Sequence, residues 1–229
     1  MKNKRFLPDL SAFFFLLTLL LAFVSWGSSI YGAGEVQSLL SAEGIRWVLG
    51  HVVENYVQTP ALGVVLVLLM GGGIVVESGL YDTFKRLCRK EKQLSRKERR
   101  ALTLSSAVLL VYVALIAICV GLPWNFLLGV TGSWLHSPFA KGFIYLFSLG
   151  IGLTGVVYGY VSDAFKSVSD VVNGMSGLIS RRASYFVTLF FVAQFFSAFS
   201  YTRLSEWFDL SDGVVEVVYQ LCCYLPLLL

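Results

Sequence analysis

Five apolar runs of about 20 residues, each without a charged side chain, limit what this chain can fold into. A bilayer core roughly 30 Å thick takes about 20 apolar residues of helix to cross, so each run has the length of a transmembrane helix. Because 56% of the residues are hydrophobic and only 14% are charged, one soluble core could not bury so much apolar surface. The sequence predicts an all-α, polytopic helical membrane protein, a single membrane domain over residues 1–229 with spans at about 10–30, 60–76, 101–122, 142–160 and 183–201.

A sixth segment, residues 213–229, leaves the number of transmembrane helices at five or six. It is apolar but short, carries Glu216 and Gln220, and fits an interfacial, a re-entrant or a spanning segment.

The first apolar run could be either a cleaved signal peptide or a retained span. Three basic residues precede it, as in a signal peptide: Lys2, Lys4 and Arg5. Its apolar stretch exceeds the about 7 to 15 residues usual in signal peptides, which favours a retained span.

Lysine and arginine fall almost entirely on one side of these spans. Of the 18, only Arg46, Lys141 and Arg203 fall on the side opposite to the N-terminus. Short loops that are rich in positive charge stay in the cytoplasm. We therefore expect a multi-pass protein of the bacterial inner (cytoplasmic) membrane, with its N-terminus in the cytoplasm.

Many of these positive charges lie in residues 81–100, which the pattern predicts to be a basic cytoplasmic loop between the second and third spans. Such a loop could bind anionic lipid headgroups or RNA. Because the charges flank two spans directly, membrane topology and contact with the lipid bilayer are favoured. Nucleic acid is not an expected partner, since no aromatic platform or nucleic-acid-binding fold accompanies the charges.

Residues 38–49, ahead of the second span, predict an amphipathic helix on the outer surface of the membrane. Leu40, Trp47 and Val48 would lie on its buried side, and Ser41 would cap its beginning. Because tryptophan commonly marks membrane interfaces, a connecting helix with an aromatic anchor is favoured over a substrate site.

The patterns of catalytic and metal sites are missing from the sequence. The four cysteines lack the spacing of metal ligands, and His51 and His136 are each isolated. Neither a Ser/His/Asp arrangement nor a phosphate-binding glycine loop occurs, so we expect no enzyme, no metal site and no cofactor. Gln194 lies inside the fifth span, where an amide needs a hydrogen-bond partner. A contact between helices is favoured there over a contact with substrate.

Blocks of this sequence resemble the AbgT family of p-aminobenzoyl-glutamate transporters, and they occur in family order and spacing. Together they cover most of the chain up to about Tyr201. The blocks are 38–49 (SLLSAEGIRWVL), 60–67 (PALGVVLV), 76–80 (VESGL), 94–102 (LSRKERRAL), 137–142 (SPFAKG), 155–159 (GVVYG), 166–167 (KS), 170–172 (DVV) and 193–195 (AQF).

The resemblance also implies missing parts. In the family, a re-entrant hairpin and several helices lie between the second helix and the block 94–102, where this chain has the short basic segment. A second hairpin and further helices follow the fifth span of the family. The chain thus resembles an internally deleted and C-terminally shortened member. Transporters of this type bind substrate and coupling ions at such hairpins, because exposed backbone groups there coordinate charged ligands.

Carried over residue by residue, the resemblance marks Gln194 and Tyr201 as substrate-binding residues. Gln194 matches the family's Ala-Gln-Phe. Ser200 and Tyr201 stand where the family pattern Phe-Asn-Trp has asparagine and tryptophan, so an aromatic side chain is kept and the amide is not.

Two functions remain open from the sequence. The resemblance implies transport of p-aminobenzoyl-glutamate or a related aromatic anionic compound, driven by a cation gradient, in a homodimer. The alternative is a non-transporting remnant, or a partner-dependent subunit that associates with a full-length relative. The missing hairpins favour this alternative, as do span centres without lysine or arginine to bind a carboxylate.

Overall fold

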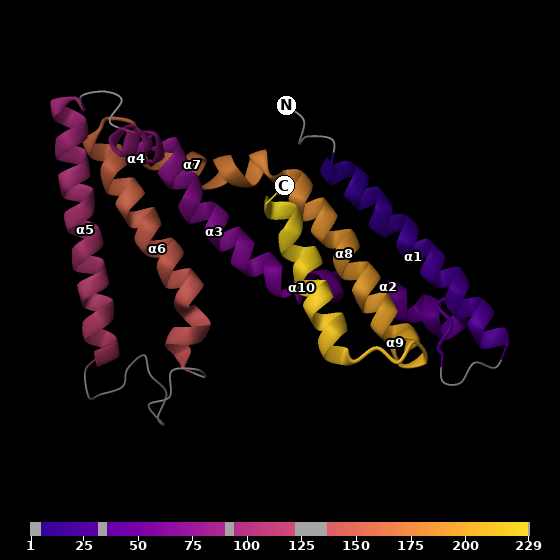
Figure 1. Ribbon diagram of the computed structural model, residues 1–229. Coiled ribbons are helices and arrows are strands. Elements are labelled where there is room, and N and C mark those ends of the chain that lie inside the picture. The colour runs from indigo at the N-terminus through magenta and orange to yellow at the C-terminus, as the bar shows by residue number, and fades with distance from the viewer. Residues whose placement is uncertain (1–5, 32–35, 90–93, 122–136, 229) are drawn as a thin grey trace. The chain divides into compact units, whose positions relative to one another are not determined.

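A computed structural model describes residues 6–31, 36–89, 94–121 and 137–228 (Figure 1). Every regular element in these ranges is a helix, so the all-α prediction is confirmed. Five helical stretches in the described ranges are long and apolar enough to cross a membrane, which agrees with the five predicted spans. They are α1 (Phe6–Ile30), α2 (Ala42–Val57) together with α3 (Pro60–Glu77), α5 (Arg96–Gly121), α6 (Pro138–Val161) and α8 (Ala183–Thr202).

The helices form two compact units, which are described separately. The first unit comprises Met1–Gly63 and Arg182–Leu229, and the second comprises Val64–Arg181. The single membrane domain expected from the sequence stays a prediction.

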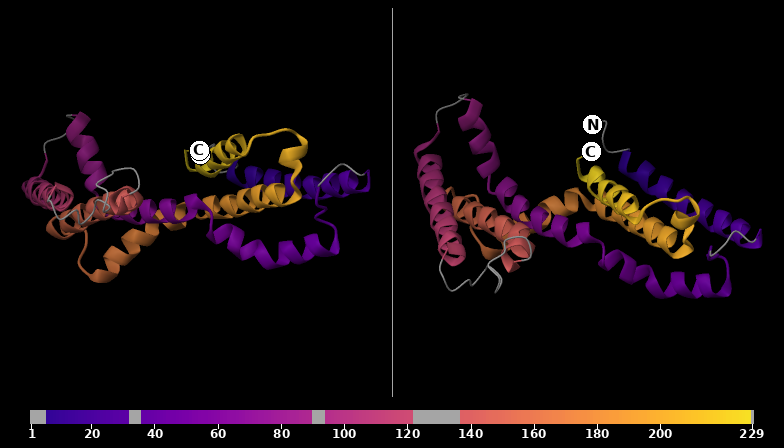
Figure 2. Two further views of the ribbon diagram at one scale, coloured as in Figure 1. Left: turned by 90° about the horizontal axis from the view of Figure 1, so that it is seen from below. Right: turned by 60° about the horizontal axis from the view of Figure 1, so that its bottom comes forward.

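In the first unit, α8 is the central helix. It packs along α1, while α2 and α10 (Asp212–Leu228) lie against it on opposite sides (Figure 2). Leu21, Leu39, Ala198 and Leu204 form a buried apolar cluster. A short helix, α9 (Leu204–Trp207), connects α8 to α10. The doubtful segment 213–229 is thus largely a 17-residue helix packed on α8.

The predicted amphipathic helix forms as α2, and it continues beyond residue 49 to Val57. Ser41 caps it as expected, because the Gly44 backbone N–H donates to Ser41 Oγ at 3.0 Å. Trp47 and Val48 pack against the buried apolar cluster, as predicted. The prediction for Leu40 is wrong, since this residue precedes the helix and is 45% exposed.

In the second unit, glycines allow close approach of three helices, α3, α6 and α7 (Val168–Arg181). Gly71 lies against Ser148, whose hydroxyl donates to the carbonyl oxygen of Val67 at 2.5 Å. Gly73 lies against the backbone of Gly174 in α7. The triplet 71–73, which intrinsically weakens a helix, therefore lies in a continuous helix and permits backbone contact.

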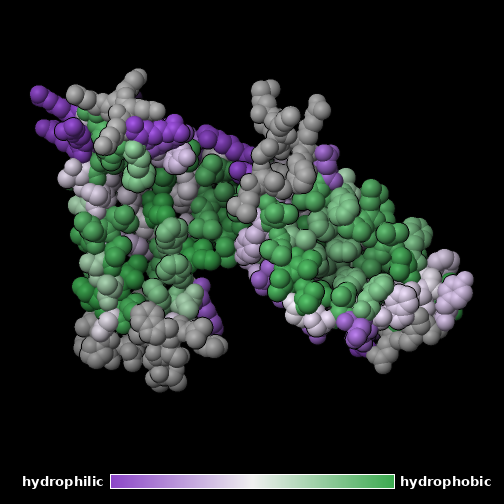
Figure 3. All heavy atoms as spheres, viewed as in Figure 1, coloured by the Kyte–Doolittle hydropathy of each residue, from purple (hydrophilic) through white to green (hydrophobic). Residues whose placement is uncertain are grey.

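The basic segment 81–100 requires correction, because it is not one loop. It is helical in α4 (Leu80–Arg89) and again from Arg96, where α5 begins. Residues 90–93 lie outside the described ranges. Helix α4 forms because its apolar and charged side chains recur at helical spacing on opposite faces. Within the second unit, Figure 3 shows hydrophilic residues gathered at one end, with a hydrophobic band along α5 and α6 below them.

Candidate functional site

A cavity of about 390 Å³ lies in the first unit, between α1, α2 and α8. Helix α8 supplies Phe190, Phe191, Gln194 and Ala198 to its lining. Phe190 and Phe191 precede Gln194 by four and three residues, and Ala198 follows it by four, so the four side chains share one face of the helix. The other walls come from α1, from the segment before α2 and from α2 itself: Phe15, Thr18, Leu19, Ala22, Leu39, Leu40, Ile45, Trp47, Val48, Leu49 and Val52.

Gln194 is the main polar group of this cavity. Its Nε2 donates to the carbonyl oxygen of Val52 at 2.8 Å, and Asn55 Nδ2 donates to its Oε1 at 3.5 Å. The amide therefore joins α8 to α2, which is the interhelical contact that the sequence favoured. A primary amide has two hydrogens and two lone pairs. One hydrogen and one lone pair of Gln194 thus have protein partners in the described structure, and its side chain lines the cavity.

Three aromatic rings form a stack beside the cavity. Trp47 lies between the rings of Tyr201 and His51, with centroid distances of 4.3 Å and 5.2 Å and interplanar angles of 21° and 18°. His51 Nδ1 lies 2.8 Å from the carbonyl oxygen of Trp47, so this nitrogen carries the proton that it donates. Both contacts hold the indole in one orientation.

The two predicted site residues therefore occupy different positions. Gln194 lines the cavity directly, whereas Tyr201 stacks on Trp47 and supports the cavity wall through it. Sequence reasoning missed Asn55, because it belongs to α2 and reaches Gln194 of α8 only in the fold. It also missed His51, although this residue follows Trp47 by four positions in the same helix, a spacing that places the two rings side by side. The aromatic residues of α8 could have been found, since Phe190 and Phe191 precede Gln194 at helical spacing.

The side chains of the cavity lining are apolar apart from the Thr18 hydroxyl, the Gln194 amide and the indole N–H of Trp47, and the lining residues include no charged side chain. Thr18 Oγ1 donates to the carbonyl oxygen of Phe14 at 2.9 Å. The cavity can therefore hold an aromatic ring and offer it one hydrogen-bonding amide. It has no side chain that would compensate a carboxylate.

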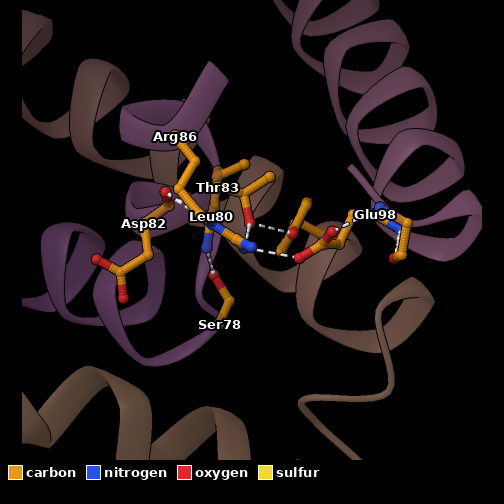
Figure 4. Close-up of polar contacts among 8 residues, drawn as sticks. Ser78, Leu80, Asp82, Thr83, Arg86 and Glu98 are labelled. Atoms are coloured by element: carbon orange, nitrogen blue, oxygen red, sulfur yellow. Dashed lines mark hydrogen bonds and ion pairs between the residues drawn. The ribbon is translucent and has the colours of Figure 1, made fainter. Parts of the chain in front are cut away.

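Charged groups concentrate instead in the second unit, at the end where α4 lies. Figure 4 shows Arg86 between Thr83 and Glu98. Its guanidinium donates to Thr83 Oγ1 at 3.0 Å and to Glu98 Oε1 at 2.6 Å. Thr83 is also hydrogen-bonded to Tyr158 of α6, with 2.7 Å between the two hydroxyl oxygens. This network ties α4 to α5 and α6.

A smaller polar pocket of the second unit, about 210 Å³ in volume, is lined by residues that include Glu77, Asp170 and Asn173. Each carboxylate already has a partner. Glu77 pairs with Arg181, and Asp170 accepts the backbone N–H groups of Lys166 and Ser167 at 2.8 Å and 2.9 Å. These hydrogen bonds hold the pKa of Asp170 below its ordinary value. Within the described residues, no group of three histidine, cysteine, aspartate or glutamate side chains could hold a metal ion.

Comparison with known proteins identifies relatives over nearly the whole chain. The family described as "AbgT putative transporter family" matches residues 6–90 and 85–215. A p-aminobenzoyl-glutamate transport protein of Escherichia coli (strain K12) is 26% identical over 172 residues, which are 73% of this chain and 33% of that protein. The chain thus spans about a third of the length of this curated relative.

Two solved structures share the fold. The YdaH transporter of Alcanivorax borkumensis superposes with a TM-score of 0.77 at 18% identity, over 86% of this chain and 72% of that one. The MtrF protein of Neisseria gonorrhoeae, whose structure is described as illuminating a class of antimetabolite efflux pumps, superposes with a TM-score of 0.76 at 18% identity. The match covers 86% of this chain and 70% of MtrF. At this identity the likeness concerns the fold. The relatives are transporters, and none is described as an enzyme.

Proposed function

The chain belongs to the AbgT transporter family, and on this premise we propose that it transports an aromatic anionic compound, such as p-aminobenzoyl-glutamate, across the bacterial inner membrane. The observation that carries the proposal is the cavity between α1, α2 and α8, with its aromatic walls and its single amide. The name of the Escherichia coli relative supports this substrate class.

The cavity suits the aromatic half of such a compound. A ring can contact the edge of Trp47, whose faces are covered by Tyr201 and His51, and the rings of Phe190 and Phe191, because aromatic faces and edges attract one another. The Gln194 amide can then bond a polar substituent of the ring. Tyr201 contributes indirectly, since its ring holds the indole in place.

The anionic half of the substrate needs a different environment. No charged side chain belongs to the cavity lining, so the carboxylates would remain outside this apolar space, where water or a cation compensates them. A cation gradient as the driving force fits this requirement, because a cation bound beside a carboxylate reduces the cost of carrying the charge.

Flux measurements in proteoliposomes test the proposal. Labelled p-aminobenzoyl-glutamate is offered to vesicles that contain the chain, with and without a sodium or proton gradient, and to protein-free vesicles. We expect gradient-dependent accumulation above the protein-free control, slowed by Trp47→Ala and largely kept by Trp47→Phe. If correctly inserted protein gives no flux, the alternative of a partner-dependent subunit is favoured. Adding a full-length relative to the vesicles should then restore flux.

We also propose that the N-terminus and α4 face the cytoplasm and that the chain forms a dimer. The charge distribution supports the orientation, since 15 of the 18 lysine and arginine residues fall on the N-terminal side of the predicted spans. A reporter fused ahead of residue 1 tests the orientation, because it should be protected from external protease in spheroplasts, where a reporter on the other side of the inner membrane would be cleaved. Mass measurement in detergent tests the dimer.

A further inference from the structure

Helix α4 carries an exposed apolar face within the described structure. Tyr81 is 53% exposed, Phe84 is 58% exposed and Leu87 is 49% exposed, and the neighbouring Cys88 is exposed as well. At 100° per residue these side chains occupy one arc of the helix. The opposite arc carries the charged residues Asp82, Lys85, Arg86 and Arg89.

The position of α4 is fixed by its neighbours. It follows α3 and precedes α5, and both of these belong to stretches long and apolar enough to span a membrane. The bonds of Thr83 to Tyr158 and of Arg86 to Glu98 hold it against α6 and α5. This 10-residue helix is held between the end of one span and the beginning of the next, so it must lie close to the membrane surface.

Positive charge surrounds this helix. Residues 80–89 and 94–100 contain seven basic and two acidic side chains. Of the basic ones, Arg86 pairs with Glu98 and Lys97 pairs with Asp163. The others form no ion pair within the described residues, and they are Lys85, Arg89, Arg96, Arg99 and Arg100. Figure 3 shows the resulting hydrophilic end of the second unit.

From these observations we propose that α4 is an interfacial helix that binds anionic phospholipid. Its apolar arc enters the boundary between headgroups and acyl chains, in the leaflet where α3 ends and α5 begins. The basic side chains of α4 and of the beginning of α5 that form no ion pair within the described residues bind the phosphate groups. Bilayer lipid is the occupant that fits, because an apolar arc beside a cationic arc matches an acyl region beside anionic headgroups.

The depth of Cys88 tests the apolar contact. The other three cysteines, Cys119, Cys222 and Cys223, are replaced by alanine, and a spin label is placed on Cys88 in vesicles of equal phosphatidylcholine and phosphatidylglycerol. We expect collisions with oxygen to exceed those with a water-soluble nickel reagent. The same label at Arg89→Cys, on the charged arc, should show the reverse. Equal water exposure at both positions overturns the proposal, and so does shielding of Cys88 from both reagents, which would indicate cover by protein.

Lipid selectivity tests the charge contact separately. The preference of the full chain for spin-labelled phosphatidylglycerol over phosphatidylcholine is compared with that of Lys85→Gln/Arg89→Gln. We expect the preference of the double variant to be at least about threefold lower than that of wild type. In wild type the preference should also fall as the salt concentration rises. Lys141→Gln is the matched control, because Lys141 lies near the beginning of α6, whereas Tyr158, near its other end, contacts α4. An unchanged preference in the double variant, or an equal loss in the control, contradicts anionic lipid binding.

Discussion

At the scale of single residues, one amide has two roles that the sequence alone could not separate. Gln194 joins α8 to the carbonyl oxygen of Val52 and to Asn55, and it also lines the cavity. A polar residue in a predicted span is visible in the sequence, and so is its need for a partner. The partner itself lies 142 positions away along the chain and depends on how α2 folds back against α8.

Replacement of this amide should weaken the first unit modestly. We expect Gln194→Leu to lower the free energy of unfolding by about 1 kcal/mol, because side-chain hydrogen bonds between membrane helices contribute about that much. Unfolding in detergent by stepwise denaturant measures the change. Val187→Leu on the same helix is the control, since Val187 is 55% exposed and should tolerate the change. Equal stability of wild type and Gln194→Leu would mean that the interhelical bond is unimportant.

The elements themselves were predictable where a long uncharged run determines them. Hydrophobic length did not reveal α4 or the beginning of α5, although the amphipathic spacing of 80–89 and a cap at the beginning of α5 are both visible in the sequence. The packing of α10 on α8 was not predictable, because it depends on the tertiary fold. Two caps carry a sequence signature, Ser followed three residues later by an acid. Ser95 and Glu98 mark the beginning of α5, and Ser167 and Asp170 mark that of α7.

Helix contacts of the second unit give a test of the glycine triplet. A Cβ atom at Gly73 would collide with the carbonyl oxygen of Gly174, so α3 and α7 would have to separate. We expect Gly73→Ala to destabilise the protein by about 1–3 kcal/mol, the usual cost of overpacking. Gly63→Ala, in the same helix but with no atom within 4 Å of the new Cβ, should be neutral or stabilising. Thermal unfolding of both variants in detergent measures the difference. If the glycines only weaken the helix and make no backbone contact, both alanine variants should be more stable than wild type.

The cap of α7 predicts a dependence of stability on pH. Backbone N–H groups hold the pKa of Asp170 below its ordinary value. The charged carboxylate therefore stabilises the fold fully at pH values above the ordinary pKa, and this stabilisation is lost as the pH falls through the lowered pKa. We expect Asp170→Asn to unfold at a lower temperature than wild type at pH 7. The difference should disappear between about pH 5 and pH 2. A difference that persists at low pH would show that the charge is not responsible.

At the scale of the whole molecule, the family resemblance carried most of what the sequence revealed about function. Membership is confirmed by matches to residues 6–90 and 85–215. Composition and charge alone indicated a multi-pass membrane protein but not its function, because the apolar spans of many transporters have similar sequences. The cavity could not be foreseen, since its walls join α1 and α2 to α8, which lies far from both in the sequence. Trp47 was interpreted as an interfacial anchor, and its stack with Tyr201 appears only when α2 lies against α8.

The most direct test of the account is equilibrium binding of labelled p-aminobenzoyl-glutamate to purified protein in which the cavity has been filled. Ala22 lines the cavity, so Ala22→Phe should occupy its space, whereas Leu20 on the same helix is 58% exposed and Leu20→Phe should leave the cavity open. We predict at least about tenfold weaker binding for Ala22→Phe, equivalent to about 1.4 kcal/mol, and wild-type binding for Leu20→Phe. Equal affinity in both variants, with both folded, would contradict the assignment of substrate to the cavity between α1, α2 and α8.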